Sequence, residues 1–224
     1  MDAKVEAPAR LPIGWNRLEM AERAAQDIPE GWYVNLGIGM PTGIADYVPL
    51  DREVVFHSEN GVLGMGPKPP EDQRDPWLIN AGKQHVTLRP GGSFVHHADS
   101  FAMIRGGHLD LCVLGAFEVA DNGDIANWAT SDNDAAPAVG GAMDLAAGAK
   151  RLWVIMDHTT KSGGKKLVRK CTYPLTALGA VKRVITNLGV FDVTERGFVV
   201  VELAPGITLE QARAQSEAEL HLAS

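Results

Sequence analysis

Cysteine is scarce in this chain of 224 residues, which holds only Cys112 and Cys171. Two cysteines so far apart in the sequence make neither a disulfide scaffold nor a zinc site built on thiolates. Cys112 lies in the apolar run 109–114 and is predicted to be a buried core thiol. Long apolar runs are also missing, since no stretch approaches the roughly 20 residues that cross a bilayer. Residues 1–10 lack the apolar segment of a secretory signal, so we expect a cytoplasmic protein that does not bind a membrane.

A basic excess is missing too. Lysine and arginine number 21 against 28 acidic residues, which gives a formal net charge of −7. Surfaces that bind nucleic acid usually carry a basic excess, so nucleic acid is not an expected partner. Apolar residues make up 45% and charged residues 22% of the chain, as in ordinary globular proteins. The length is sufficient for one domain with a core of its own.

The order of predicted elements indicates an α/β fold. Residues 1–13 show no periodic pattern and are predicted to form a flexible tail, followed by a single domain over 14–224. Asn16 can form a capping box with Glu19, and Thr208 can cap a last helix that runs to about Leu220. Strands are predicted at 32–36, 54–57, 109–114, 152–156, 181–185, 190–193 and 198–203, with further helices at 42–47, 97–105 and 140–149. Apolar strands that alternate with helices are typical of a mostly parallel sheet covered by helices.

A glycine loop, Gly37-Ile38-Gly39, directly follows the first predicted strand. Such loops let the backbone approach a phosphate or a reacting carbonyl. The spacing departs from a dinucleotide fingerprint because Pro41 interrupts it and Gly43 falls one place late. The local pattern leaves three interpretations open: a structural turn, a ligand loop or a dinucleotide site.

Glu59 follows the predicted strand 54–57 in a tight turn, Ser58-Glu59-Asn60-Gly61. Ligands of open α/β sheets collect beyond the carboxyl ends of the strands. A carboxylate there can act as a nucleophile that forms a covalent intermediate. From the spacing alone, a turn glutamate that accepts backbone hydrogen bonds is favoured over a nucleophile.

Other polar groups have weaker patterns. His96 and His97 are adjacent, and with Asp99 they lack the spacing of metal ligands, so no metal is expected. The turn that begins Gly115-Ala116 follows a buried strand and could form an oxyanion hole or simply end the strand. The basic segment around Lys161, Lys165 and Lys166 could bind a phosphate or a dicarboxylate substrate, or be a solvated loop.

Taken in order, several motifs closely resemble the B subunit of 3-oxoacid CoA-transferases over nearly the whole chain. They are Tyr33-Val34-Asn35-Leu36-Gly37-Ile38-Gly39-Met40-Pro41-Thr42, Ser58-Glu59-Asn60-Gly61 with Leu63-Gly64-Met65-Gly66-Pro67, Asn80-Ala81-Gly82-Lys83, Ala98-Asp99-Ser100-Phe101 with Arg105-Gly106-Gly107, Gly115-Ala116-Phe117, Gly123-Asp124-Ile125-Ala126-Asn127-Trp128, Gly140-Gly141-Ala142-Met143-Asp144 and Cys171-Thr172-Tyr173-Pro174-Leu175-Thr176.

The resemblance implies a family I CoA-transferase fold and a ping-pong reaction. Glu59 would be the nucleophile that takes CoA from succinyl-CoA as a glutamyl thioester and passes it to a 3-oxoacid. Gly115 and Ala116 would donate to the oxyanion, and Asn35, Asn60 and the loop with Gly37 and Gly39 would border the pocket. No cofactor is implied beyond coenzyme A as a substrate. A separate A subunit would complete a hetero-oligomer.

The acceptor is less sharply defined by the resemblance. The stretches 96–100, 135–141 and 157–161 are similar to the 3-oxoadipate branch, with acetoacetate as the alternative acceptor. Glu118 departs from the glutamine of many relatives, so it is expected to point away from the site or to alter substrate handling. A thioester hydrolase and a non-catalytic, sugar-phosphate-binding regulator are the rival interpretations.

Overall fold

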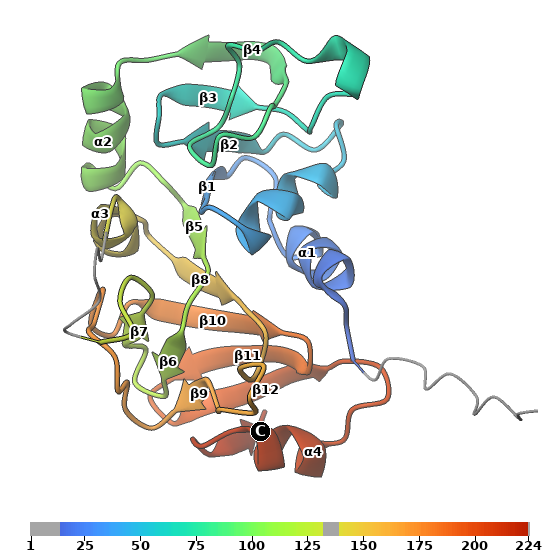
Figure 1. Cartoon of the computed structure of the whole chain (residues 1–224), viewed down its shortest axis with the longest axis vertical. Coiled ribbons are helices and arrows are strands. Elements are labelled where there is room, and N and C mark those ends of the chain that lie inside the picture. Colours follow the sequence, from blue (N-terminus) through green and yellow to red (C-terminus); the bar gives the residue numbers. More distant parts are fainter. Residues whose placement is uncertain (1–13, 132–138, 224) are drawn as a thin grey trace, which may run out of the picture.

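The computed structural model describes residues 14–131 and 139–223, so the predicted tail at 1–13 lies outside the described residues. In this part of the chain, a ten-stranded sheet is the central element of the fold (Figure 1). Its order is β13 (Leu220–Leu222), β12 (Gly197–Leu203), β11 (Gly189–Thr194), β10 (Val181–Thr186), β8 (Leu152–Ile155), β5 (Leu111–Leu114), β1 (Tyr33–Leu36), β2 (Val55–Ser58), β3 (Val62–Met65) and β4 (Leu88–Phe94).

The centre of the sheet is parallel, as predicted. Neighbouring strands run parallel from β10 through β8, β5 and β1 to β2. The strands of this centre are short, mostly apolar and almost fully buried. This pattern is typical of parallel strands whose sheet is covered on both faces. Antiparallel pairs flank the centre, with β3 and β4 on one side and β11 and β12 on the other.

Helices cover the two faces of this centre. The core therefore consists of two clusters, one on each face of the sheet. On one face lie α1 (Arg17–Gln26) and the 3₁₀ helix η1 (Met40–Asp46), which pack on Val34 and Phe56. On the other face lie α2 (His97–Arg105) and α3 (Ala142–Gly148), which pack near Cys112 and Leu114. Cys112 is fully buried there, as the sequence predicted.

The capping residues of the first and last α-helices act as predicted. Asn16 and Glu19 form a capping box at α1, and Thr208 forms one with Gln211 at α4 (Leu209–Gln215). The predicted extension of the last helix to Leu220 is wrong, because α4 ends at Gln215 and Leu220 then pairs with β12 as part of β13. The helix predicted at 42–47 is the 3₁₀ helix η1. That helix begins at Met40, and the Thr42 hydroxyl donates to the Gly39 carbonyl.

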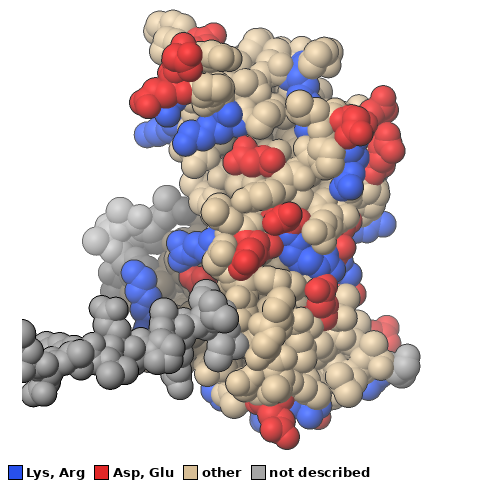
Figure 2. Space-filling model, turned by 90° about the vertical axis from the view of Figure 1, so that its right-hand side faces the viewer, with Lys and Arg blue, Asp and Glu red and all other residues tan. Residues whose placement is uncertain are grey.

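A second sheet, of three strands in the described residues, lies beside the first and was not predicted. It contains β7 (Ile125–Ala126), β6 (Glu118–Ala120) and β9 (Leu167–Val168). The segment 67–76 is mostly exposed and holds only the short 3₁₀ helix η2 (Glu71–Gln73). None of the helices in the described ranges is long and apolar enough to cross a membrane. On the face to the right of Figure 1, charges of both signs are interspersed (Figure 2).

Candidate active site

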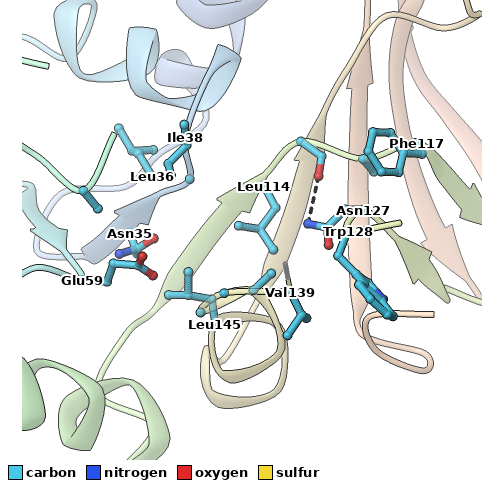
Figure 3. A pocket seen from close by; sticks show the side chains of 17 residues that line it. Asn35, Leu36, Ile38, Glu59, Leu114, Phe117, Asn127, Trp128, Val139 and Leu145 are labelled. Atoms are coloured by element: carbon cyan, nitrogen blue, oxygen red, sulfur yellow. Dashed lines mark hydrogen bonds between the residues drawn. The ribbon is translucent and has the colours of Figure 1, made fainter. Parts of the chain in front are cut away.

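Three parallel strands end at one cavity of about 440 Å³. β1 leads into Gly37, β2 into Glu59 and β5 into Gly115, so the carboxyl edge of the sheet gathers residues that lie far apart in the chain. Figure 3 shows Asn35 and Glu59 toward one end of this cavity, and Phe117 and Trp128 toward the other. Its lining includes Asn35, Gly37, Glu59, Gly115, Ala116, Asn127 and Gly141.

The strand–turn geometry holds Glu59 at the edge of the sheet. Gly61 closes the turn after β2 by donating its N–H to the Ser58 carbonyl at 2.9 Å. The loop 79–84 is tied to the same turn, since Ala81 N donates to Ser58 Oγ (2.9 Å) and Asn60 Nδ2 to the Ile79 carbonyl (2.8 Å). Ala81 thereby lines the cavity beside Glu59. Asn60 supports this loop and is not among the lining residues.

Burial makes the Glu59 carboxylate a stronger base than an ordinary glutamate. Loss of solvent raises its pKa, the charge of His97 opposes this rise, and the charge of Asp144 adds to it. Within the described part of the chain, no side chain or backbone group forms a hydrogen bond to this carboxylate. A partly buried carboxylate without donors has the character of a nucleophile rather than of a turn-stabilising acceptor.

Gly141 packs directly against Glu59. A Cβ atom at this position would overlap Oε2 of Glu59 and would lie 3.2 Å from its Cδ and 3.1 Å from Cζ of Phe101. Only glycine therefore allows α3 to begin at this distance from the carboxylate. The motif 140–144 gives no indication of this role for Gly141, because nothing local in the sequence connects it to Glu59.

The turn after β5 is held by a side chain that sequence reasoning also left without a role. Asn127 Nδ2 donates to the Gly115 carbonyl at 3.2 Å, the dashed line in Figure 3. Asn127 Oδ1 in turn accepts from Thr176 Oγ1 at 2.7 Å, so the amide is fixed from both sides. Gly115 and Ala116 line the cavity.

Glu118 points away from this cavity, which is the first of its two predicted outcomes. It is 7% exposed, and its two carboxylate oxygens accept from Thr172 N (2.6 Å) and Thr172 Oγ1 (2.8 Å). These bonds satisfy the buried charge within the second sheet. The charge is therefore kept out of the site.

The glycine loop serves two purposes. A Cβ at Gly37 would come 2.8 Å from Leu114 Cδ2 and 3.1 Å from the Val113 carbonyl, so this glycine permits the close approach of β1 to β5. Gly39, which does not line the cavity, adopts a φ of 94° at the start of η1. This arrangement favours the turn and the ligand loop over the dinucleotide site that the local pattern left open.

The three lysines do not lie in the Glu59 cavity. Lys161 and Lys166 line a neighbouring cavity of about 430 Å³, which shares Phe117 with the first. Lys165 is exposed, and its ammonium donates to the Ser216 carbonyl at 3.0 Å.

The histidines considered for a metal have other contacts. His96 caps α2 by accepting from Ala98 N, and the His97 ring packs on Phe101 with centroids 4.8 Å apart. Among the described residues there is no group of three or more His, Cys, Asp or Glu side chains that could hold a metal ion.

The arrangement of a strand-end carboxylate, glycine turns and a helix start at one edge of an α/β sheet is typical of an acyl- or group-transferring enzyme. Comparison with known proteins narrows this class. Residues 17–214 match the family model described as coenzyme A transferase.

Curated relatives agree over almost the full chain. The B subunit of the 3-oxoadipate CoA-transferase of Acinetobacter baylyi is 55% identical over 91% of this chain and 94% of its own length. The B subunit of the succinyl-CoA:3-ketoacid coenzyme A transferase of Helicobacter pylori is 48% identical over 92% of this chain and 99% of its own. Among solved structures, an acyl-CoA transferase of Escherichia coli O157:H7 has the same fold, with a TM-score of 0.72 and 23% identity over 95% of this chain and 42% of its own.

The chain therefore belongs to the coenzyme A transferase family, and the predicted enzyme class and fold class are confirmed.

Proposed function

We propose that this chain is the nucleophile-bearing subunit of an enzyme that transfers CoA from succinyl-CoA to a 3-oxoacid, with Glu59 as the nucleophile. The observation that carries the proposal is the position of Glu59: a partly buried carboxylate of raised pKa, without hydrogen-bond donors among the described residues, in a cavity at the ends of β1, β2 and β5. The identity of about one half with curated CoA-transferase B subunits supports it.

The first half-reaction forms the enzyme-bound thioester in two steps. A Glu59 oxygen attacks the thioester carbonyl of succinyl-CoA, the carbon–sulfur bond breaks, and CoA leaves as the thiolate. The product is a mixed anhydride of Glu59 and succinate. The thiolate then attacks the glutamyl carbonyl, which gives a Glu59–CoA thioester and releases succinate. A 3-oxoacid carboxylate reverses these steps and leaves as its CoA ester, so the kinetics are ping-pong.

Each step in this scheme places negative charge on a carbonyl oxygen next to the cavity wall. Pre-aimed N–H donors stabilise such charge by about 10²–10³-fold in rate per donor. Gly115 and Ala116 line the cavity, and Asn127 holds the peptide of Gly115 in place. We assign the donor role to this turn. No cofactor is needed, because coenzyme A is both substrate and covalent intermediate.

An A subunit completes the enzyme in this proposal. A mixed anhydride hydrolyses readily, so the site must exclude water during the reaction. A cavity that lies between two subunits provides this exclusion, and the relatives at 48–55% identity are named as B subunits. A cytoplasmic location is part of the same proposal and is supported by two free cysteines, Cys112 and Cys171.

We favour 3-oxoadipate over acetoacetate as the acceptor. The 3-oxoadipate CoA-transferase chain has the higher identity, 55% against 48% for the succinyl-CoA:3-ketoacid enzyme. A dicarboxylate acceptor also gives a purpose to Lys161 and Lys166, whose cavity adjoins the Glu59 cavity at Phe117. Of the stretches that resemble the 3-oxoadipate branch, part of 135–141 lies outside the described residues.

The deciding experiment measures the mass of this chain after the co-expressed A and B complex has received succinyl-CoA without an acceptor. We expect a gain of one CoA less one water, mapped to Glu59 and discharged by 3-oxoadipate faster than by acetoacetate. The matched control is Glu59→Gln, which keeps the shape of the side chain and should form no adduct. The variant should lose activity by at least about 10³-fold.

The other outcomes separate the rival functions. Consumption of succinyl-CoA without an adduct would point to a thioester hydrolase. Intact succinyl-CoA and no adduct would leave a non-catalytic ligand-binding protein or a different donor. Faster discharge by acetoacetate would overturn the choice of acceptor alone.

A further inference from the structure

A row of buried polar side chains crosses the sheet directly before the Glu59 turn. His57 on β2 pairs in register with Asn35 on β1, and Asn35 pairs with Cys112 on β5. Register partners in parallel strands project from the same face of a sheet, which here is the face covered by α2 and α3. From α2, Ser100 reaches the same row. These four residues are between 0% and 2% exposed.

Hydrogen bonds join this row end to end. Ser100 Oγ lies 2.8 Å from His57 Nε2, and His57 Nδ1 lies 2.9 Å from Asn35 Nδ2. Asn35 Nδ2 also donates to the His57 carbonyl at 3.2 Å, and Cys112 Sγ donates to Asn35 Oδ1 at 3.8 Å.

The directions of these bonds fix the tautomer of His57. An amide nitrogen can only donate, so His57 Nδ1 must present its lone pair to Asn35 and the ring proton must sit on Nε2. That proton is donated to Ser100. The bond from Asn35 to the His57 carbonyl fixes the orientation of the amide, because an amide oxygen at that place would face another acceptor.

The row keeps these hydrogen-bond directions because its titratable groups are uncharged. Burial lowers the pKa of His57 to about 4, and burial together with the charge of Glu59 raises the pKa of the Cys112 thiol. His97 on α2 and Asp144 on α3 are the charged groups that act on Glu59 itself. At neutral pH the imidazole is therefore neutral and the thiol is protonated, so each hydrogen bond in the row keeps its donor and its acceptor.

The consequence concerns Asn35, which shares the cavity with Glu59. Its amide nitrogen donates to two acceptors of His57, so neither hydrogen is free for the cavity. A free donor beside Glu59 would bond to the carboxylate, stabilise its charged form and weaken it as a nucleophile.

We propose that His57 is a positioning residue for the transfer reaction, which holds the N–H donors of Asn35 away from the Glu59 carboxylate. The inference rests on the proposed function. It assigns no contact with substrate to His57, which acts only through Asn35.

Two substitutions separate the two halves of the row. His57→Asn places an amide oxygen near the position of Nδ1, which keeps the acceptor for Asn35 but removes the hydrogen bond to Ser100. His57→Gln places an amide nitrogen near the position of Nε2, which keeps the donor to Ser100 but removes the acceptor for Asn35. Both variants remove the buried ring, so both should lower the melting temperature.

The measurement is the rate of Glu59–CoA adduct formation in the co-expressed complex across a range of pH. We expect His57→Gln to slow this step by about 10- to 100-fold and to move its acid limb to lower pH, because Asn35 then stabilises the ionised Glu59. His57→Asn should retain most of the rate and the wild-type limb.

His158 provides the matched control. It is 1% exposed, lies 2.9 Å from both Thr186 Oγ1 and Ser216 Oγ, and does not line the Glu59 cavity. The same two substitutions there should lower the melting temperature without changing the rate. Equal losses in both His57 variants, or an unchanged rate in His57→Gln, would overturn the inference. A wild-type complex that forms no adduct would instead overturn the proposed function.

A second readout does not depend on activity. In the complex labelled with ¹⁵N-histidine, the signal that disappears in His57→Asn belongs to His57. We expect it to show the tautomer protonated at Nε2 at neutral pH. A proton on Nδ1 would contradict the inference, because Asn35 would then face His57 with its oxygen and leave its donors free.

Discussion

The backbone of Gly141 lies so close to Glu59 that a methyl group at Gly141 would overlap the carboxylate oxygen Oε2. The substitution Gly141→Ala must therefore displace Glu59, the proposed nucleophile. Because a misplacement of about 1 Å can cost about 10²-fold in rate, we expect kcat to fall by this order while binding of the CoA ester changes little. Steady-state kinetics of the complex measure both constants.

Gly43→Ala is the matched control for this prediction. A Cβ at Gly43 would lie 3.7 Å from Ala21 Cβ, an ordinary contact on the opposite face of the sheet. It should leave kcat unchanged. A wild-type kcat in Gly141→Ala would mean that Glu59 does not need its observed position.

The centre of the fold and its edge of loops could be predicted because the signals are local. Buried parallel strands appear in the sequence as short apolar runs, and the residues that follow them, such as Glu59 and Gly115, must meet at the carboxyl edge. The capping box at Asn16 is equally local, since it needs only Glu19 three positions away.

The remaining parts depend on contacts that no local pattern contains. β4 includes Pro90, Gly91 and Gly92, which weaken any strand signal and are tolerated because β4 lies at the sheet edge. β13 is three residues long and forms only because β12 offers a partner. The contact between Gly141 and Glu59 joins distant segments. Both residues lie in motifs that the sequence shows, but nothing in the sequence indicates that they touch.

Burial of the Glu59 charge predicts a pH-dependent gain in stability for Glu59→Gln. The pKa of Glu59 is raised in the folded protein, so the contribution of this group to stability is fully present below the pKa of an unfolded glutamate, about 4.3, and is lost as the pH rises through the folded pKa. Glutamine never ionises. We therefore expect Glu59→Gln to raise the melting temperature of the complex at neutral pH and to leave it unchanged below about pH 4.

Thermal unfolding across this pH range measures the effect. The informative quantity is the difference between variant and wild type at each pH, because the other carboxylates cancel in it. A gain of the same size at every pH would show that the amide improves packing and that the charge of Glu59 carries no penalty.

The charges of His97 and Asp144 act on Glu59 in opposite directions. His97 lowers the pKa of Glu59 and Asp144 raises it. Since only the ionised carboxylate attacks in the proposed reaction, the rate of adduct formation should fall as the pH drops through the pKa of Glu59. We expect His97→Gln to move this acid limb to higher pH and Asp144→Asn to move it to lower pH. Shifts in the same direction would exclude a direct effect of these charges.

Asp144 needs a control of its own, because it also forms an ion pair with Arg105 at 2.7 Å. Arg105→Gln removes the pair but keeps the Asp144 charge. If the limb follows the charge on Asp144, Arg105→Gln should not reproduce the shift of Asp144→Asn. Matching shifts would assign the effect to the lost pair and a movement of α3.

The lysine cavity next to Phe117 predicts which variants affect a dicarboxylate acceptor. Lys166 is partly buried and Lys161 is exposed, and both line this cavity. If the second carboxylate of 3-oxoadipate is held there, Lys166→Met should lower kcat/KM for 3-oxoadipate by about tenfold, the effect of one charge-assisted hydrogen bond. The value for acetoacetate, which has no second carboxylate, should stay the same.

Lys170→Met is the control, because Lys170 is exposed and lines neither cavity. Equal losses for both acceptors would mean that Lys166 supports the fold or binds the CoA portion common to both reactions.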